Sequence, residues 1–302
     1  MLEEYKNILS KPERKDGRIW YNAHFASLSE LYDFLESDPP INEQVFKQLA
    51  SQKLGNSGFY GESYQRALEY LIEGYSGELE EFLELIRKLD FIIPEMDLGS
   101  RTEPSYIGSR IHIPNALAGS PKYMRRLVRE EEKKFVNIYF NLAYPHYTSE
   151  PEIRNRGILT INLIKMLEKN NYRVHFKTFQ LVTNYNEVCY IEIILKQFGY
   201  DLNEERCYYP LCRKEFLRRI LFRVMESMAF KENWEDGYGS NISIHEAKSL
   251  LELNSDDILI GYPDNMGIHG KSLAKDASNL FEKIHLEKYI EIDKEKIKRL
   301  TL

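Results

Sequence analysis

Several short motifs in the sequence contain residue types that can do chemistry, but each lacks a part of the pattern that its chemistry needs. His245 and Glu246 would begin the zinc-binding helix of a metalloprotease, but no second histidine follows four residues later. The stretch 237–240 lacks the further glycine of a phosphate-binding loop and does not lie directly between a strand and a helix. Cys207 and Cys212 have no second Cys or His pair at zinc-site spacing. The sequence therefore predicts no catalytic residue, no bound metal and no cofactor.

Tyrosine and arginine residues give a stronger signal than any catalytic motif. The chain has 21 Tyr against 2 Trp, and a tyrosine can be half buried while its hydroxyl stays polar and accessible. Arginines recur on the helix expected after Pro210. We interpret these side chains as a candidate protein interface, because interfaces favour Tyr and Arg. The alternative is that the tyrosines belong to a half-buried core and that the arginines pair with Glu215 and Glu226. The candidate interface residues are Tyr144, Tyr147, Tyr185, Tyr190, Tyr208, Tyr209, Arg213, Arg218 and Arg219.

The elements that position these residues fall into three expected domains. Residues 1–90 are expected to form a helical N-terminal domain, since apolar residues from Tyr21 to Asp90 recur at helical spacing. Residues 91–134 contain many Pro and Gly residues and predict a connector with a short strand and helix. Residues 135–302 alternate strand and helix patterns and predict an α/β domain.

The α/β domain is expected to contain a mostly parallel sheet. Ser149 and Glu152 form a capping-box pattern at the start of a helix, with Pro151 in its first turn. A β-α-β order with crossovers of this length predicts parallel strands with helices on the faces of the sheet, which is a three-layer arrangement. The predicted fold class is α+β overall, with a helical N-terminal domain and this α/β C-terminal domain. Its strands are expected at 135–144, 172–182, 188–196 and 257–262.

The loop after the first of these strands resembles the metal-binding loop of von Willebrand factor A-type domains. In that type of domain, an Asp and two hydroxyl residues after the strand bind a divalent metal. Here Asn141 is neutral and Ala143 has no side-chain oxygen, whereas hard cations prefer anionic oxygen ligands. We therefore expect a degenerate site without metal, in which the two hydroxyl residues serve as structural caps. Its candidate residues are Asn141, Thr148, Ser149 and Asp264.

Several stretches together resemble a family of bacteriophage-encoded proteins of unknown function. The resemblance implies phage origin and a central von Willebrand factor A-like or Rossmann-like α/β domain, but no reaction. The Gabija anti-defence proteins of phages are similar to this chain in size and character. The matching stretches lie at 61–64, 73–75, 113–124, 156–157, 167–168, 172–174, 210 and 216–222.

Composition excludes several classes of protein. Lys and Arg total 41 and Asp and Glu total 47, so the net charge of −6 argues against a broadly basic nucleic-acid binder. No apolar run reaches the length of about 18 residues that a membrane span needs. The 3 Cys are too few for a disulfide framework. We therefore expect a protein of the bacterial host cytoplasm, with neither membrane nor nucleic acid as partner.

The functional hypothesis is a non-enzymatic phage protein that inhibits a host defence complex by occluding its surface. Binding of this kind needs only a large complementary interface, and we also expect the protein to form a homo-oligomer. One alternative is a metal-dependent hydrolase or nucleotide-handling enzyme built around Thr148, Ser149 and Asp264. The other alternative is a virion or assembly component.

Overall fold

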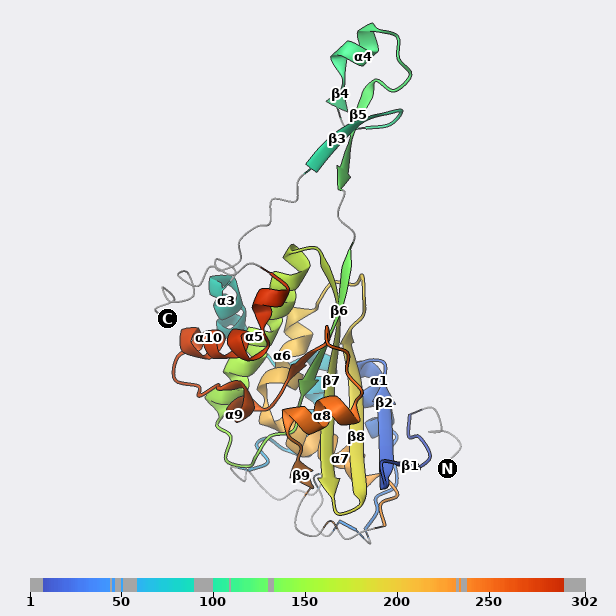
Figure 1. Ribbon diagram of the computed structural model, residues 1–302. Coiled ribbons are helices and arrows are strands. Elements are labelled where there is room, and N and C mark those ends of the chain that lie inside the picture. The colour runs from blue at the N-terminus through green and yellow to red at the C-terminus, as the bar shows by residue number, and fades with distance from the viewer. Residues whose placement is uncertain are drawn as a thin grey trace.

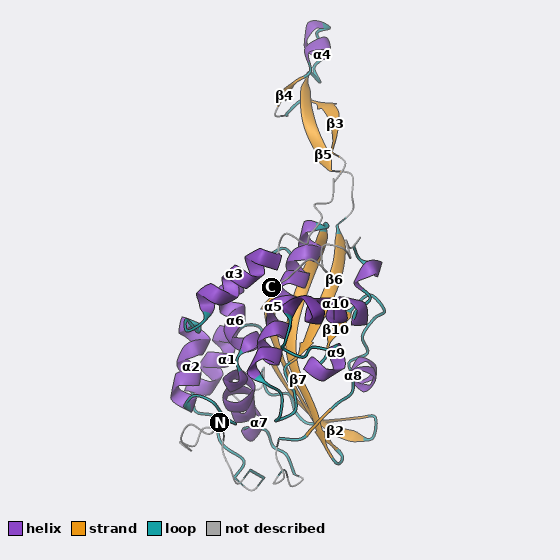
Figure 2. Ribbon diagram, turned by 90° about the vertical axis from the view of Figure 1, so that its left-hand side faces the viewer, coloured by secondary structure: helices purple, strands orange, loops and turns teal. Residues whose placement is uncertain are grey.

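A computed structural model describes residues 8–43, 45–46, 50, 59–89, 100–108, 110–129, 133–231, 234 and 238–290. Figures 1 and 2 show a large body built around one sheet and a small three-stranded sheet that lies apart from it. The small sheet and its helix, residues 100–129, are called the module below.

The large sheet has seven strands and is mixed. Its order is β1-β2-β8-β7-β6-β10, and β9 pairs with β7. The pairs β2–β8, β6–β7 and β6–β10 are parallel, whereas β1–β2, β7–β8 and β7–β9 are antiparallel. The expectation of a mostly parallel sheet is therefore wrong. The strands are β1 (Glu13–Lys15), β2 (Arg18–Phe25), β6 (Lys134–Asn141), β7 (Tyr172–Asn184), β8 (Glu187–Lys196), β9 (Ser240–Asn241) and β10 (Ile258–Ile260).

The connection between β7 and β8 explains why the sheet is mixed. Only Tyr185 and Asn186 separate the two strands, and a loop this short can join only antiparallel strands. Tyr185 adopts a left-handed conformation with φ of 48°, as residues in tight hairpin turns do. In addition, residues 18–25 form β2, which pairs with β8, so the N-terminal part of the chain contributes strands to the sheet as well as helices.

Most described helices pack on one face of the large sheet, and α8 lies on the other (Figure 2). The larger apolar core joins this helical layer to the sheet, whereas a smaller core joins α8 to Trp20, Phe179 and Tyr190 on the opposite face. The second face is only partly covered, so the expected three-layer arrangement is also wrong. The helices are α1 (Leu28–Glu36), α2 (Tyr64–Glu73), α3 (Leu79–Leu89), α5 (Glu150–Lys169), α6 (Glu204–Cys212), the π-helix η2 (Phe216–Leu221), α7 (Phe222–Glu226), α8 (Ile244–Leu250), α9 (Pro263–Met266), α10 (Leu273–Lys283) and the 3₁₀ turn η3 (Leu286–Lys288).

Helix α5 lies at the centre of the helical layer. The expected capping box is confirmed, because Ser149 and Glu152 satisfy each other's backbone groups at its N-terminus. Gly157 lies where α5 approaches α6, and a Cβ atom there would overlap the Cys212 sulfur and lie 3.0 Å from the Leu211 carbonyl oxygen. The absence of a side chain at Gly157 therefore sets the close packing of these two helices.

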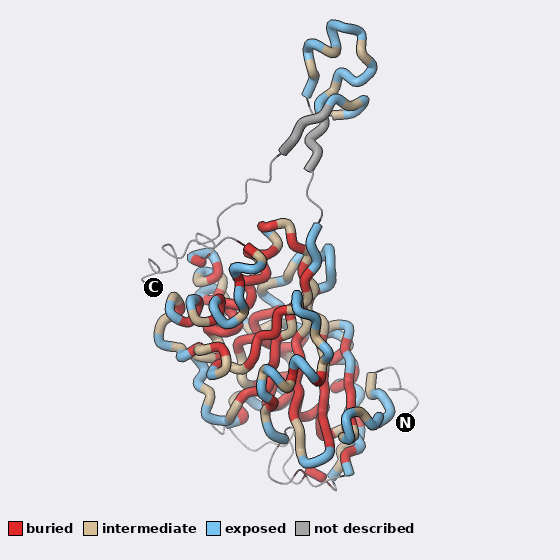
Figure 3. The backbone as a smooth tube through the Cα atoms, viewed as in Figure 1, coloured by how far each residue is buried: buried red, intermediate tan, exposed pale blue. Residues whose placement is uncertain are grey.

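The module is a small antiparallel sheet with one short helix. Its strand order is β3-β5-β4. None of its side chains whose burial is described, at 104–108 and 110–125, is buried (Figure 3). The elements are β3 (Ser100–Ser105), β4 (Arg110–Ile111), α4 (Ile113–Leu117) and β5 (Met124–Arg129).

Candidate binding surface

Polar groups of the loop after β6 form hydrogen bonds within the loop and to its neighbours. The Asn141 side chain is buried, and its Oδ1 accepts a hydrogen bond from the Ala143 backbone N–H at 2.9 Å. Ser149 is engaged in the α5 cap through Glu152. Asp264, from α9, accepts a hydrogen bond from the Tyr147 hydroxyl at 3.3 Å. Among the described residues, no group of three or more His, Cys, Asp or Glu side chains is arranged to hold a metal ion.

A buried arginine lies beside this loop. Arg156 of α5 is fully buried, and its Nη1 donates to the carbonyl oxygens of Asn141 and Gly261, both at 2.9 Å. Its guanidinium lies 4.3 Å from the centre of the Phe140 ring, and burial lowers the pKa of Arg156 to about 10. The arginine thus links the end of β6 to the residue that follows β10. A cation in this position and a neutral Asn141 do not fit a divalent metal, which needs anionic oxygen ligands.

The expected interface arginines of η2 lie inside the protein. Arg218 is 3% exposed and donates to the carbonyl oxygens of Phe59, at 2.6 Å, and His146, at 3.1 Å. Arg219 is 1% exposed and donates to the carbonyl of Ala50 at 2.8 Å. Both side chains stabilise backbone carbonyls of neighbouring segments, so they do not form an exposed surface in this chain.

The expected interface tyrosines are divided between the interior and the surface. The Tyr208 hydroxyl donates to Glu78 at 2.9 Å, and the Tyr190 hydroxyl donates to Glu192 at 2.6 Å. Tyr147 and Tyr185 are exposed and come from different loops. The candidate tyrosines therefore do not form one surface. The other four are buried, and they are Tyr144, Tyr190, Tyr208 and Tyr209.

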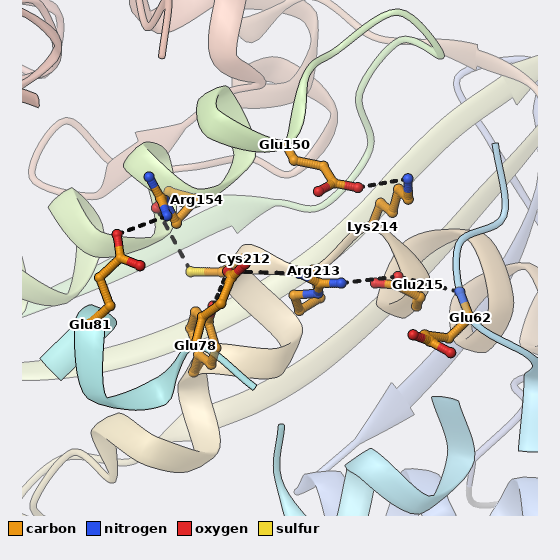
Figure 4. A network of polar contacts seen from close by, with 10 residues as sticks. Glu62, Glu78, Glu81, Glu150, Arg154, Cys212, Arg213, Lys214 and Glu215 are labelled. Atoms are coloured by element: carbon orange, nitrogen blue, oxygen red, sulfur yellow. Dashed lines mark hydrogen bonds and ion pairs between the residues drawn. The ribbon is translucent and has the colours of Figure 1, made fainter. Parts of the chain in front are cut away.

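Arg213 belongs to a network that joins the helices of the large body (Figure 4). Its guanidinium lies 3.3 Å from Glu215 and 3.9 Å from Glu78, the residue before α3. Burial opposes the charge of Arg213, but Glu215 and other nearby groups together outweigh it and raise the pKa of Arg213. Arg154 of α5 pairs with Glu81 of α3 at 3.2 Å. Acidic side chains on α3 and just before it therefore neutralise basic side chains of α5 and of the residues after α6.

The two large apolar side chains with the highest exposed fractions in the described chain belong to the module. Ile107 and Leu117 are 80% and 84% exposed, and the Lys122 ammonium lies 5.4 Å from the Tyr106 ring centre. A three-stranded unit of this size has too little buried surface to satisfy its apolar residues alone. The other exposed apolar side chains of the module are Tyr106, Ile111, Ile113 and Tyr123.

The module also differs in charge from the rest of the chain. Residues 100–129 contain six basic residues and one acidic residue, a net charge of +5. Since the whole chain carries −6, the remaining residues sum to −11, which is −6 minus +5. The basic residues are Arg101, Arg110, Lys122, Arg125, Arg126 and Arg129.

Comparison with known proteins gives a family without an assigned activity. A family model described as a domain of unknown function, DUF7192, matches residues 13–288. The chain belongs to this family. The matched residues include both the large sheet and the module. No curated protein matches the chain. No solved structure matches it either.

Two features of this DUF7192 chain were missed by reasoning from the sequence. The surface of the module has a sequence signal, because residues 100–129 contain six basic residues and one acidic residue. Arg156 also has a signal, because it is a charged residue within the apolar stripe of α5.

The described part of the chain contains no helix that is both long and apolar enough to cross a membrane.

Proposed function

We propose that this DUF7192 protein acts by binding another protein, and that the module is the contact surface. The exposed apolar side chains of the module carry this proposal. Exposed apolar clusters mark interaction sites in soluble proteins, and arginine and tyrosine at such sites contribute most to binding. The net charge of +5 favours a partner whose surface is acidic.

The specific form of the proposal is inhibition of a host defence complex by a phage-encoded protein. The module carries exposed Ile107, Ile113 and Leu117, which suits occlusion of a partner surface. A metal-dependent reaction at the loop after β6 receives no support from the donor groups, because Arg156 and Asn141 do not fit a hard cation.

Site-specific photo-crosslinking tests the contact surface. A benzophenone amino acid at position 107 is expected to crosslink to one acidic protein in producing cells, identified by mass spectrometry. The matched control is position 72, because Ile72 is also exposed, at 50%, but lies on α2. Equal crosslinking from both positions, or crosslinks to nucleic acid alone, would contradict the proposal.

A plating assay tests the inhibitory role. In bacteria that carry a Gabija-type defence system, expression of the chain is expected to restore phage plating by at least about tenfold. The variant with Ile107→Asp and Leu117→Asp is expected to lose this effect. Burying two unpaired carboxylates at the contact is unfavourable by more free energy than the apolar contact of these side chains contributes to binding. Ile72→Asp is the control that keeps it. No restoration by the wild-type chain would overturn the inhibitory role against this system but not the contact surface, which the crosslinking tests separately.

A further inference from the structure

The partly covered face of the large sheet contains a pocket that the module does not touch. The pocket has a volume of about 250 Å³ and lies between β1, β2, β8, β6 and the end of α8. Trp20, Asn22 and His24 of β2 lie on one face of that strand, opposite Val188, Tyr190 and Glu192 of β8. The lining thus combines aromatic rings, hydrogen-bonding groups and carboxylates on rigid strands. The residues used below are Glu13, Trp20, Asn22, His24, Tyr190 and Glu192.

Two buried polar atoms of this pocket have no partner among the described residues. They are the Trp20 Nε1, which is a donor, and the Asn22 Oδ1, which is an acceptor. Trp20 is 3% exposed and Asn22 is 8% exposed. The Asn22 Nδ2 donates to Glu13 at 3.0 Å, and this bond fixes the orientation of the amide. The two residues are two positions apart on a strand, so their side chains project from the same face about 7 Å apart.

Two carboxylates and a lysine line the pocket, and one of the carboxylates, Glu192, is paired. Burial alone would raise the pKa of Glu192, but the nearby His24, the hydrogen bond from Tyr190 and the charge of Lys177 outweigh it and lower the pKa to about 2. Lys177 Nζ lies 3.3 Å from both Glu192 oxygens, and His24 Nδ1 lies 3.8 Å from one of them. The lysine of the lining, Lys15, is paired with Glu252 at 2.8 Å. Glu192 is paired with Lys177, so Glu13, which accepts a hydrogen bond from the Asn22 amide, is the carboxylate of the lining that a cationic ligand can pair with.

We propose that this pocket binds an extended peptide segment with a basic side chain. A peptide group presents one acceptor and one donor, which match the unpartnered Trp20 Nε1 and Asn22 Oδ1. The basic side chain then lies toward Glu13, with Tyr190 beside it. A phosphorylated ligand is disfavoured, because the Glu13 carboxylate repels it. This site is separate from the module and does not depend on the proposed function.

Calorimetric titration of the full chain with small blocked peptides tests the site. Acetyl-Ala-Arg-Ala-methylamide is expected to bind, and the citrulline peptide, which has the same shape without the charge, is expected to bind at least about tenfold more weakly. Trp20→Phe keeps the ring but removes the donor, and it should weaken the arginine peptide about tenfold. Asn22→Leu should do the same, because it removes the acceptor.

Tyr200→Phe is the control, because Tyr200 is exposed outside the pocket. Circular dichroism of each variant verifies that it is folded, and Trp20→Phe is the conservative substitution. No binding by the wild-type chain up to about 5 mM peptide would overturn the proposal. Equal affinities for the arginine and citrulline peptides, or unchanged affinity in both Trp20→Phe and Asn22→Leu, would also overturn it. Tighter binding of uridine or adenosine than of the arginine peptide would assign the pocket to nucleosides and overturn it equally.

Discussion

Buried charges in this chain are stabilised by neighbours that come from distant parts of the sequence. Arg156 has two backbone carbonyls and an aromatic ring around its guanidinium. Arg219 has carbonyls from residues 50 and 62. Charged hydrogen bonds of this kind contribute about 1.5–3 kcal/mol each when both partners stay paired. From the sequence, Arg219 is expected either at an interface or paired with Glu215 or Glu226, because the carbonyls that it contacts lie far away in the chain.

The lowered pKa of Glu192 predicts a loss of stability in acid. A carboxyl whose pKa is lower in the folded protein stabilises the fold above its unfolded pKa of about 4.5, and this contribution is lost as the pH falls toward about 2. Denaturant unfolding of the wild-type chain from pH 6 to pH 2.5 should show this loss, up to about 3 kcal/mol. Glu192→Gln should have lower stability at pH 6 and a flatter profile over that window. A variant profile that parallels the wild type would contradict the assigned interactions of Glu192.

Arg219→Met tests the structural role of the η2 arginines. Methionine keeps much of the volume but leaves the carbonyls of Ala50 and Glu62 without their donor. The free energy of unfolding is expected to fall by about 2–4 kcal/mol, as measured by chemical denaturation. A surface role for Arg219 would instead give a change within about 0.5 kcal/mol.

At the scale of elements, the close approach of α5 and α6 depends on one glycine. Gly157→Ala would place a methyl group against Cys212 and 3.0 Å from the Leu211 carbonyl. We expect the free energy of unfolding to fall by about 1–3 kcal/mol, because a packed helix pair cannot move apart without cost. Thermal or urea unfolding measures the change. The double variant Gly157→Ala, Cys212→Ala should recover part of it, and equal destabilisation of the single and double variants would show that the sulfur is not the obstacle.

The elements could be predicted from the sequence wherever the signal is local. The α5 capping box is local, since Ser149 and Glu152 lie three residues apart, and it was found. The hairpin of β7 and β8 is also local, but the strands expected at 172–182 and 188–196 leave five residues between them, whereas the loop in the structure has two. Residues from Tyr21 onward are expected to be helical, but residues 18–25 form the strand β2. Its alternation, with Tyr21 and Phe25 toward one core and Trp20 toward the other, becomes clear only in the structure.

At the scale of the whole molecule, charge is separated along the chain. The module carries +5, and the remaining residues sum to −11, which is −6 minus +5. The average of −6 hides this separation, and it argues only against a broadly basic nucleic-acid binder. The candidate site therefore could be predicted only in part: the concentration of basic residues is visible in the sequence, whereas the exposure of Ile107 and Leu117 depends on how the module folds.

The most direct measurement of the proposed contact is the yield of the position 107 crosslink in two proteins that differ in charge. One is the wild-type chain, and the other carries Arg110→Glu, Lys122→Glu and Arg125→Glu, three exposed positions of the module. The proposal predicts that the crosslink to one acidic protein falls at least about tenfold in the charge-reversed protein and is weakened by added salt in the wild type. The same yield from both proteins would contradict a contact between the basic module and an acidic partner.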